Sequence, residues 1–298
     1  MINYLKFQAN TMRELLLGPY AKIESARTFS EKEALDFLLG FKWDRPWKIN
    51  YLTMQAHRYA ITLEHLSCLP KETRTLEIGA MPFGFTLLLR HVLFNDVQAS
   101  DFDDKFQPVH AEKQARKEIF ISKDGAISYG IDISRFNIEK DPWPYEDDSF
   151  DLVIAAEVLE HMIQDPMHVV SEANRVLRKG GNLFISTPNL LSLWKLDRLF
   201  DGLQPIGDPF YRLDSVYNRH NRELTPEEVG VLYNSGGFDV AYIHTLNVKR
   251  KKINNPLRFF FIRMLAGSIH KRKDIIFAMG TKRDSVRERY PTACQLYK

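Results

Sequence analysis

The sequence predicts an α/β protein with an open, mostly parallel β-sheet and helices on both faces. The first observation is the order of elements over residues 150–188, where an apolar run, a helical stretch, Gly180-Gly181 and a second apolar run that Pro188 ends follow one another. This is the order of a crossover between two parallel strands. The second is a strand that ends in a glycine, Thr75–Gly79, and the third is Asp101, directly after the next strand. The carboxyl ends of such strands are where an open α/β sheet binds ligands.

The composition is typical of an ordinary globular protein, with 298 residues, 44% hydrophobic and 27% charged. This length favours one large domain with an appendage. No run approaches the ~18 apolar residues of a membrane span, and the N-terminus shows no secretion signal. Cys68 and Cys294 lie far apart without metal-ligand spacing, so we expect free thiols and a cytoplasmic protein. The net charge of +3 does not favour a nucleic-acid partner.

Residues 1–70 carry apolar side chains at helical spacing, with Pro46 between two helical blocks. The elements after Pro70 alternate, and they are the strand 75–78, the helix 87–92 and the strand 97–100. The third strand is expected in a hairpin, because residues 118–121 and 127–131 flank Lys123-Asp124-Gly125.

Residues 190–224 break the alternating pattern. They are rich in aromatic, Gly and Pro residues and are too long for a plain connection, which predicts a lid or substrate loop. Thr225 and Pro226 then have the pattern of an N-cap followed by proline at the first helical position. That helix ends at Gly236-Gly237. The last two strands are expected at 238–243 and 274–280.

Residues 249–273 combine an apolar stretch with a basic run at each end, Lys249–Lys252 and Lys271–Lys273. One interpretation is a helix that lies on an anionic membrane surface. The other is a connecting helix packed against the edge of the sheet. The second is favoured, because the three phenylalanines at 259–261 cover more than one helix face.

Glu157, Glu160 and His161 follow the strand at the start of the 150–188 crossover. In a helix that opens at Glu157, the three side chains would share one face. Three interpretations stay open. The acids favour a helix N-terminus while His161 packs against the sheet, or His161 is a general base for a substrate hydroxyl. In the third, the three residues bind a divalent cation such as Mg²⁺ together with His220.

Three short motifs in the crossover together resemble one known family. They are Glu157-Val158-Leu159-Glu160-His161, Arg175-Val176-Leu177-Arg178-Lys179-Gly180-Gly181 and Thr187-Pro188-Asn189. This pattern resembles that of the class I S-adenosylmethionine (SAM) methyltransferases, over roughly residues 75–245. The resemblance implies a Rossmann-like seven-stranded sheet with a helical N-terminal cap and an inserted lid. The implied domains are a cap at 1–70, a methyltransferase domain at 71–285 with its lid at 190–224, and a tail at 286–298.

The resemblance also implies SAM as the cofactor. The segment Glu77–Gly84 occupies the place of the family's acidic-x-Gly-x-Gly-x-Gly loop, although Met81 and Phe83 stand where glycines are common. Gly79 and Ala80 would bring the backbone close to SAM, and Glu77 would lie near its ammonium group.

Further cofactor contacts are expected after later strands. Asp101 would accept hydrogen bonds from the ribose hydroxyls, with Asp103 and Asp104 as competitors. Asn137 and Ile138 would contact the adenine. Glu157 is assigned to both the cofactor and the catalytic set, and the other catalytic candidates are His161 and His220.

The segment Arg135-Phe136-Asn137-Ile138-Glu139 and the Pro-Trp-Pro-Tyr run after it resemble methyltransferases encoded among surface-polysaccharide genes. The implied reaction is methylation of a sugar hydroxyl, with amino-sugar N-methylation as a variant, in a surface glycan or its lipid- or nucleotide-linked precursor. Such an enzyme would work in the cytoplasm or at the inner face of the membrane, with membrane contact through 249–273. The sequence gives no indication of oligomeric state.

Two other functions stay open. Small-RNA terminal-ribose methyltransferases and ubiquinone-pathway O-methyltransferases share the Glu-x-x-Glu-His motif of residues 157–161. That likeness implies a metal-assisted enzyme acting on RNA ribose or a catechol-like ring, with RNA the weaker branch. The altered loop at Met81 and Phe83 instead favours a catalytically silent SAM-fold subunit that binds a partner.

Overall fold

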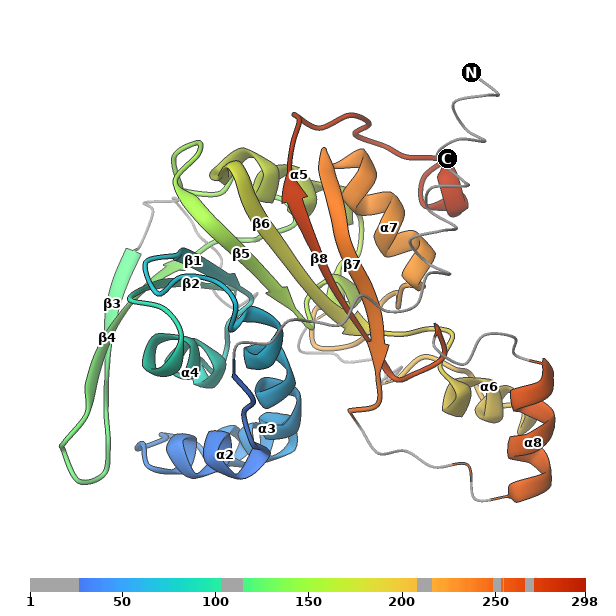
Figure 1. Cartoon of the computed structure of the whole chain (residues 1–298), viewed down its shortest axis with the longest axis horizontal. Helices are drawn as coiled ribbons and strands as arrows, with labels where there is room; N and C mark the ends of the chain where they lie inside the picture. The colour runs from blue at the N-terminus through green and yellow to red at the C-terminus, as the bar shows by residue number, and fades with distance from the viewer. Residues whose placement is uncertain (1–26, 103–114, 208–215, 249–252, 254, 266–270) are drawn as a thin grey trace. The chain divides into compact units, whose positions relative to one another are not determined.

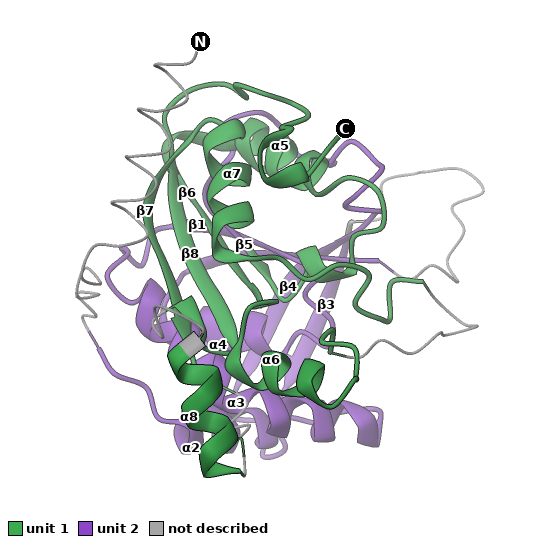
Figure 2. Ribbon diagram, turned by 90° about the vertical axis from the view of Figure 1, so that its right-hand side faces the viewer, with its two compact units in different colours: residues 1–21, 155–298 green, residues 22–154 purple. Residues whose placement is uncertain are grey.

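A computed structural model describes residues 27–102, 115–207, 216–248, 253, 255–265 and 271–298. The chain divides into two compact units, residues 22–154 (unit 2) and residues 155–298 with 1–21 (unit 1) (Figure 2). The expected domain bounds near 70 and 285 stay a prediction. None of the described helices has the length and hydropathy needed to cross a bilayer. Cys68 and Cys294 are free and exposed, as expected.

The described residues form eight strands, in the order β3-β4-β2-β1-β5-β6-β8-β7. The strands are β1 (Arg74–Ile78), β2 (Asp96–Asp101), β3 (Ala115–Ile121), β4 (Ser128–Arg135), β5 (Phe150–Ala156), β6 (Leu177–Pro188), β7 (Phe238–Leu246) and β8 (Ile275–Lys282). The helices are α2 (Glu31–Leu39), α3 (Pro46–Leu66), α4 (Gly84–Val92), α5 (Pro166–Val176), α6 (Leu193–Phe200), α7 (Pro226–Ser235) and α8 (Pro256–Leu265), with short 3₁₀ turns η1 (Leu159–His161) and η3 (Ala293–Gln295).

In unit 2, β1 pairs with β2 and β2 with β4, both in parallel, as the sequence predicts. The expected count of seven strands is short by one, because both arms of the predicted hairpin are strands. β3 pairs antiparallel with β4 along its full length. β4 also runs further than expected, so Asp132 and Arg135 lie inside the strand and not in a loop beyond it.

The helices of unit 2 begin where the sequence supplies caps. Ser30 and Glu33 form a capping box at the start of α2, and Pro46 is the first residue of α3. The helices α2, α3 and α4 pack on one another (Figure 1). The predicted cap helices are therefore present over the part of 1–70 that the structure describes.

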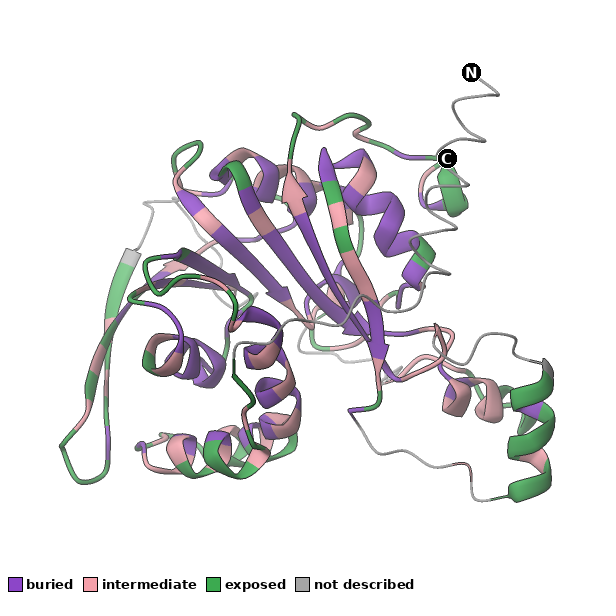
Figure 3. Ribbon diagram, in the orientation of Figure 1, coloured by how far each residue is buried: buried purple, intermediate pink, exposed green. Residues whose placement is uncertain are grey.

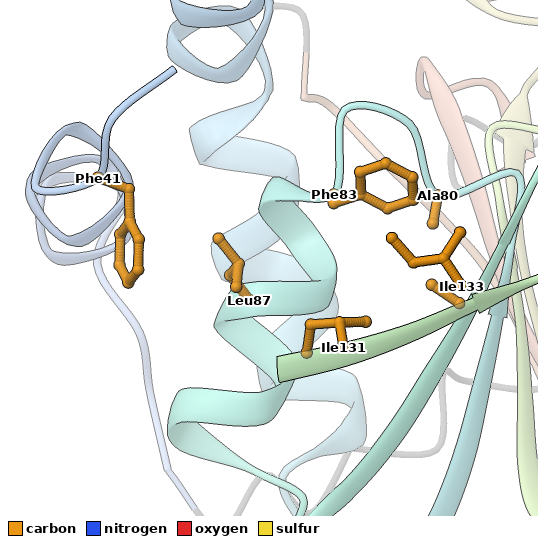
Figure 4. Packing of buried hydrophobic residues seen from close by; sticks show 7 residues of the cluster. Phe41, Ala80, Phe83, Leu87, Ile131 and Ile133 are labelled. Atoms are coloured by element: carbon orange, nitrogen blue, oxygen red, sulfur yellow. The ribbon is translucent and has the colours of Figure 1, made fainter. Parts of the chain in front are cut away.

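Phe83 lies at the N-cap of α4 and explains one departure from the family's glycine-rich loop. Its backbone is left-handed, with φ of 70°, a region that glycine adopts without strain. The side chain is nonetheless buried in a cluster that holds the start of α4 against β4 (Figure 4). The cluster consists of Phe41, Ala80, Phe83, Leu87, Ala99, Ile131 and Ile133. Burial of the ring offsets the backbone cost.

Replacing Phe83 by glycine is expected to lower the free energy of unfolding by about 2–4 kcal/mol. Loss of a buried phenylalanine costs ~3–5 kcal/mol, and relief of the backbone returns ~1 kcal/mol. Urea unfolding measures the change. Asp148→Gly is the control, because Asp148 has φ of 53° on an exposed side chain and should lose no stability. A Phe83→Gly protein as stable as the wild type would contradict this account.

In unit 1, β8 lies between β6 and β7 and pairs antiparallel with both. Thr225 and Glu228 form the predicted cap of α7, which packs along β7. The Tyr233 hydroxyl of α7 is fully buried between two strands, at 3.0 Å from the carbonyl oxygens of Leu183 and Ala278. α7 is thereby fixed to β6 and β8.

The predicted helix that opens at Glu157 is wrong. Glu157 has φ of 58°, the turn η1 covers only Leu159–His161, and Met162 is extended. The helix α5 begins instead at Pro166, because proline suits the first helical position and Asp165 accepts a hydrogen bond from the backbone N–H of His168 (3.1 Å). The expected lid at 190–224 is not a plain loop, since it contains α6, and its residues 208–215 lie outside the described part of the chain.

Candidate active site

The loop after β1 turns sharply at Gly79, whose φ of 64° suits glycine. The turn is held to the neighbouring strand, because the N–H of Ala80 donates to the carbonyl oxygen of Ser100 (2.9 Å). Gly79 is exposed, whereas Ala80 is buried. The backbone at this turn is therefore open to a ligand at the carboxyl end of β1, as the sequence predicts for this kind of loop.

Glu77 is buried at the end of β1, with 4% of its surface exposed. Its Oε2 accepts a hydrogen bond from Thr86 Oγ1 (2.5 Å) in α4. Burial raises the pKa of the Glu77 carboxyl from 4.5 to about 7. The carboxyl thus bridges β1 to α4, and a positively charged group close to it would favour its ionised form.

The raised pKa makes stability depend on pH. Between pH 4.5 and 7 the unfolded carboxyl ionises before the folded one, so the unfolded state binds fewer protons and stability falls as pH rises. The free energy of unfolding of the wild type, measured relative to Glu77→Gln, should drop by about 3 kcal/mol across this window. Comparison with Glu77→Gln removes the contribution of histidines that titrate in the same range. Parallel pH profiles for the two proteins would contradict the assignment.

Asp101 ends β2 and is buried, with 5% of its surface exposed. Its carbonyl oxygen accepts a hydrogen bond from the N–H of Phe136 (3.3 Å), just after β4. A carboxylate in this position, at the end of the second strand, is suited to ribose hydroxyls. The competing Asp103 and Asp104 lie outside the described residues.

Asn137 and Ile138 follow β4 and are both buried. The Asn137 Oδ1 accepts from the N–H of Glu139 (3.0 Å), and the Ile138 carbonyl accepts from Trp143 Nε1 (3.1 Å). A carbonyl oxygen has two lone pairs, and the hydrogen bond to Trp143 uses one of those of Ile138. The predicted adenine contacts are therefore held rigidly by local hydrogen bonds.

Glu157 is at the end of β5 in a strained conformation. Its φ of 58° costs about 1 kcal/mol for a residue other than glycine, and its N–H donates to the Ser186 carbonyl of β6 (2.8 Å). Its Oε1 is buried and has no hydrogen-bond partner among the described residues. Backbone strain of this kind is often found at ligand-binding sites.

Glu160, His161 and His220 come together in unit 1, with one ligand atom of each within 4.8 Å of the others. Glu160 is fully buried, and its Oε1 lies 3.9 Å from Nε2 of His161. The two histidine rings are 5.1 Å apart and nearly perpendicular. Glu157 is not in this group. It lies outside the 3₁₀ turn that carries Glu160 and His161, and its positive φ breaks the helical path before that turn. The four-residue cation set predicted from the sequence is thus reduced to three.

Hydrogen bonds fix the tautomers of the two histidines. His161 Nδ1 lies 2.9 Å from the carbonyl oxygen of Arg219, and since a carbonyl only accepts, Nδ1 carries the proton. His220 Nδ1 lies 2.8 Å from Glu223 Oε1, and it donates to that carboxylate. In the neutral form, both Nε2 atoms therefore keep a lone pair. This arrangement suits a general base or a metal ligand.

Glu223 and Lys195 support the histidines and were missed by the sequence analysis. Glu223 is buried and is bound by Lys195 Nζ and by the N–H of Gly207 (2.9 Å). Lys195, on α6, is itself only 1% exposed. The spacing of His220 and Glu223 within a polar stretch was the available signal. No sequence signal predicted the pairing of Lys195 with Glu223, because the two residues are 28 positions apart.

The comparisons with known proteins indicate a methyltransferase domain. Residues 76–185 match a family model described as a methyltransferase domain. A Mycolicibacterium smegmatis protein, described as a probable S-adenosylmethionine-dependent methyltransferase, is 34% identical over 110 residues, which are 37% of this chain and 36% of the relative. The match thus spans about a third of the relative's length.

A solved structure with a TM-score of 0.50 is similar in fold. A chain from the Haloferax volcanii complex that contains the Trm112 methyltransferase activator aligns with a TM-score of 0.50 and 13% identity, over 86% of this chain and 98% of that one. A SAM-dependent methyltransferase from Archaeoglobus fulgidus aligns with a TM-score of 0.47 and 16% identity, over 78% of this chain and 99% of that one. The family match and the relative thus support a SAM-dependent methyltransferase domain that includes residues 76–185 of the chain.

Proposed function

We propose that the protein transfers a methyl group from SAM to a sugar hydroxyl, in a surface glycan or in its lipid- or nucleotide-linked precursor. An amino-sugar nitrogen is the related acceptor. The observation that carries the chemistry is His161, whose Nδ1 proton is held by the Arg219 carbonyl. Its Nε2 is left to take the proton from the attacking hydroxyl. When bound, SAM supplies an activated methyl group, so the residues of the chain need only orient the acceptor, remove its proton and exclude water.

The residues expected to hold SAM are Gly79, Ala80, Asp101, Asn137 and Ile138. They fit the group in two respects. Gly79 leaves an exposed backbone turn where the ligand must approach closely, and Asp101 offers a carboxylate directly at the end of β2. Glu77 lies at the end of β1, before this loop, and accepts a hydrogen bond from Thr86. Its negative charge is expected to tighten SAM binding.

A pocket in unit 2 supports an acceptor that carries a phosphate or carboxylate. Its volume is about 530 Å³, and Met81 and Phe83 of the loop after β1 form part of its wall. The charged lining residues are Lys42, Lys48, Arg116, Arg135, Asp44 and Glu118, four cations against two carboxylates. Trp43 and Phe120 add aromatic faces on which sugar rings stack. An anionic sugar fits this combination better than a neutral one.

The decisive experiment combines binding and turnover. Titration calorimetry with S-adenosylhomocysteine should give micromolar binding, and labelled SAM should then methylate glucose 1-phosphate, UDP-glucose or glucuronate in preference to glucose. Absence of S-adenosylhomocysteine binding would refute the methyltransferase proposal. Binding without turnover on any of these acceptors would favour the silent SAM-fold subunit.

Lys42→Ala tests the pocket. We expect KM for the phosphorylated acceptor to rise about tenfold with kcat nearly unchanged, because the charge binds ground state and transition state alike. The dissociation constant for S-adenosylhomocysteine should stay the same. Lys71→Ala removes an equally exposed lysine outside the pocket and serves as the control. Equal KM values for Lys42→Ala and the control would exclude this pocket as the acceptor site.

A metal-assisted O-methyltransferase acting on a catechol-like ring or an RNA ribose is the second candidate. The grouping of Glu160, His161 and His220 favours it, since mixed carboxylate and imidazole ligands suit divalent cations. A cation there would lower the pKa of the acceptor hydroxyl. EDTA should then abolish turnover and Mg²⁺ restore it. Full activity in EDTA would show that turnover needs no divalent cation, and His161 would then be the base without a metal.

A further inference from the structure

The helix α8 presents its apolar stripe to solvent. Leu257, Phe260, Phe261 and Met264 recur at the spacing of one helix face, and each has 57–75% of its surface exposed. Figure 3 shows α8 coloured as exposed along most of its length. An amphipathic helix in a globular protein normally turns this stripe toward the core. In α8, the apolar stripe faces solvent instead.

Ion pairs to α6 fix the orientation of α8. Arg258 Nε lies 2.7 Å from Asp197 Oδ1, and Arg258 Nη1 lies 2.8 Å from Asp201 Oδ1. Ile262, one turn further along the same face, is only 2% exposed. The polar and charged contacts are thus made on the inner side of α8. This arrangement holds the phenylalanines outward, so their exposure is a property of how the helix is docked.

The neighbouring helix α6 extends the exposed apolar area. Leu199 and Phe200 at its end are 51% and 62% exposed, and the Phe200 ring lies beside the Arg258 guanidinium, 5.8 Å from it. We define the α6/α8 apolar surface as Leu199, Phe200, Leu257, Phe260, Phe261 and Met264. A grouping of this kind on a soluble unit marks an interaction site.

The charge of the surrounding sequence indicates what binds to the α6/α8 apolar surface. Residues 249–273 contain nine lysines and arginines and no aspartate or glutamate. Arg263 is exposed on α8 itself, and Lys271–Lys273 follow it in the described chain. Phenylalanine and leucine on one side of a helix, with many cations next to it in the sequence, match an anionic bilayer, whose acyl region accepts the rings and whose phosphates attract the cations.

We propose that the α6/α8 apolar surface docks on anionic lipid membranes and holds the protein at the bilayer as a peripheral protein. A protein partner is the less suitable occupant, because so dense a positive charge would need a matching acidic surface, whereas an anionic leaflet supplies it uniformly. The inference rests on unit 1 alone and does not depend on the proposed methylation.

The test is flotation of the full-length protein with vesicles of phosphatidylcholine alone or with 30% phosphatidylglycerol. We expect binding to the anionic vesicles, little binding to the neutral ones, and weaker binding as NaCl rises from 50 to 500 mM. The double variant Phe260→Ser/Phe261→Ser should bind the anionic vesicles at least tenfold more weakly. Both side chains are exposed, so circular dichroism and S-adenosylhomocysteine binding should match the wild type.

Met54→Ser is the matched control, because Met54 is 70% exposed on α3 of unit 2 and should not affect vesicle binding. Lack of binding to anionic vesicles would overturn the proposal, as would binding that the double variant retains in full. Loss of a dimer in the double variant, without any vesicle binding by the wild type, would instead assign the surface to a second copy of the chain.

Discussion

Replacing His161 by alanine is expected to lower kcat for methyl transfer by about 100- to 10,000-fold, the range for loss of a general base. The imidazole is held by the Arg219 carbonyl through Nδ1, so in the proposed reaction its Nε2 would remove the acceptor proton. S-adenosylhomocysteine affinity should stay within about threefold, because a base acts on the acceptor and not on the cofactor. Single-turnover assays with a saturating acceptor separate these two quantities.

The control for His161→Ala is His91→Ala. His91 also makes a hydrogen bond through Nδ1, to the Tyr129 hydroxyl (2.8 Å), but it is exposed near the end of α4 and is not a candidate site residue. Its removal should leave kcat unchanged. A His161→Ala protein with kcat close to that of His91→Ala would show that acceptor deprotonation needs no protein base. Positioning by the pocket would then carry the catalysis.

The positions of most strands could be predicted from the sequence because each rests on a local signal. The run at 75–78 that ends in Gly79, the Lys123-Asp124-Gly125 turn and the Thr225 cap each depend on a few neighbouring residues, and the structure contains all three. The hairpin was identified correctly, but it was expected to contribute one strand and it contributes two, because β3 pairs with β4.

The geometry of the candidate site was harder to predict from the sequence, because it depends on backbone conformations that residue patterns do not encode. Glu-x-x-Glu-His predicts one helical face only if a helix begins at Glu157. The positive φ of Glu157 and the extended Met162 prevent that. Likewise, the three phenylalanines of α8 blur its amphipathic pattern, and only the Arg258 ion pairs reveal which face is turned outward.

The second large effect is expected from Lys195→Met. Lys195 and Glu223 form an ion pair with about 1% of either side chain exposed. Removing the lysine leaves a buried carboxylate uncompensated, which typically costs about 3–5 kcal/mol of unfolding free energy. We expect this loss in urea unfolding. The exposed pair Lys32–Asp36 is the matched control, and Lys32→Met should leave stability nearly unchanged.

The double variant Lys195→Met/Glu223→Gln distinguishes a structural ion pair from a functional one. The glutamine carbonyl can still accept from Gly207 and His220 without a buried charge, so most of the lost stability should return. Activity should not return with it, because a neutral amide stabilises a charged or metal-bound His220 less than a carboxylate does. If stability and kcat recover together, the Lys195–Glu223 pair only supports the fold. If stability recovers while kcat stays low, the buried charge of Glu223 serves His220 and belongs to the catalytic apparatus.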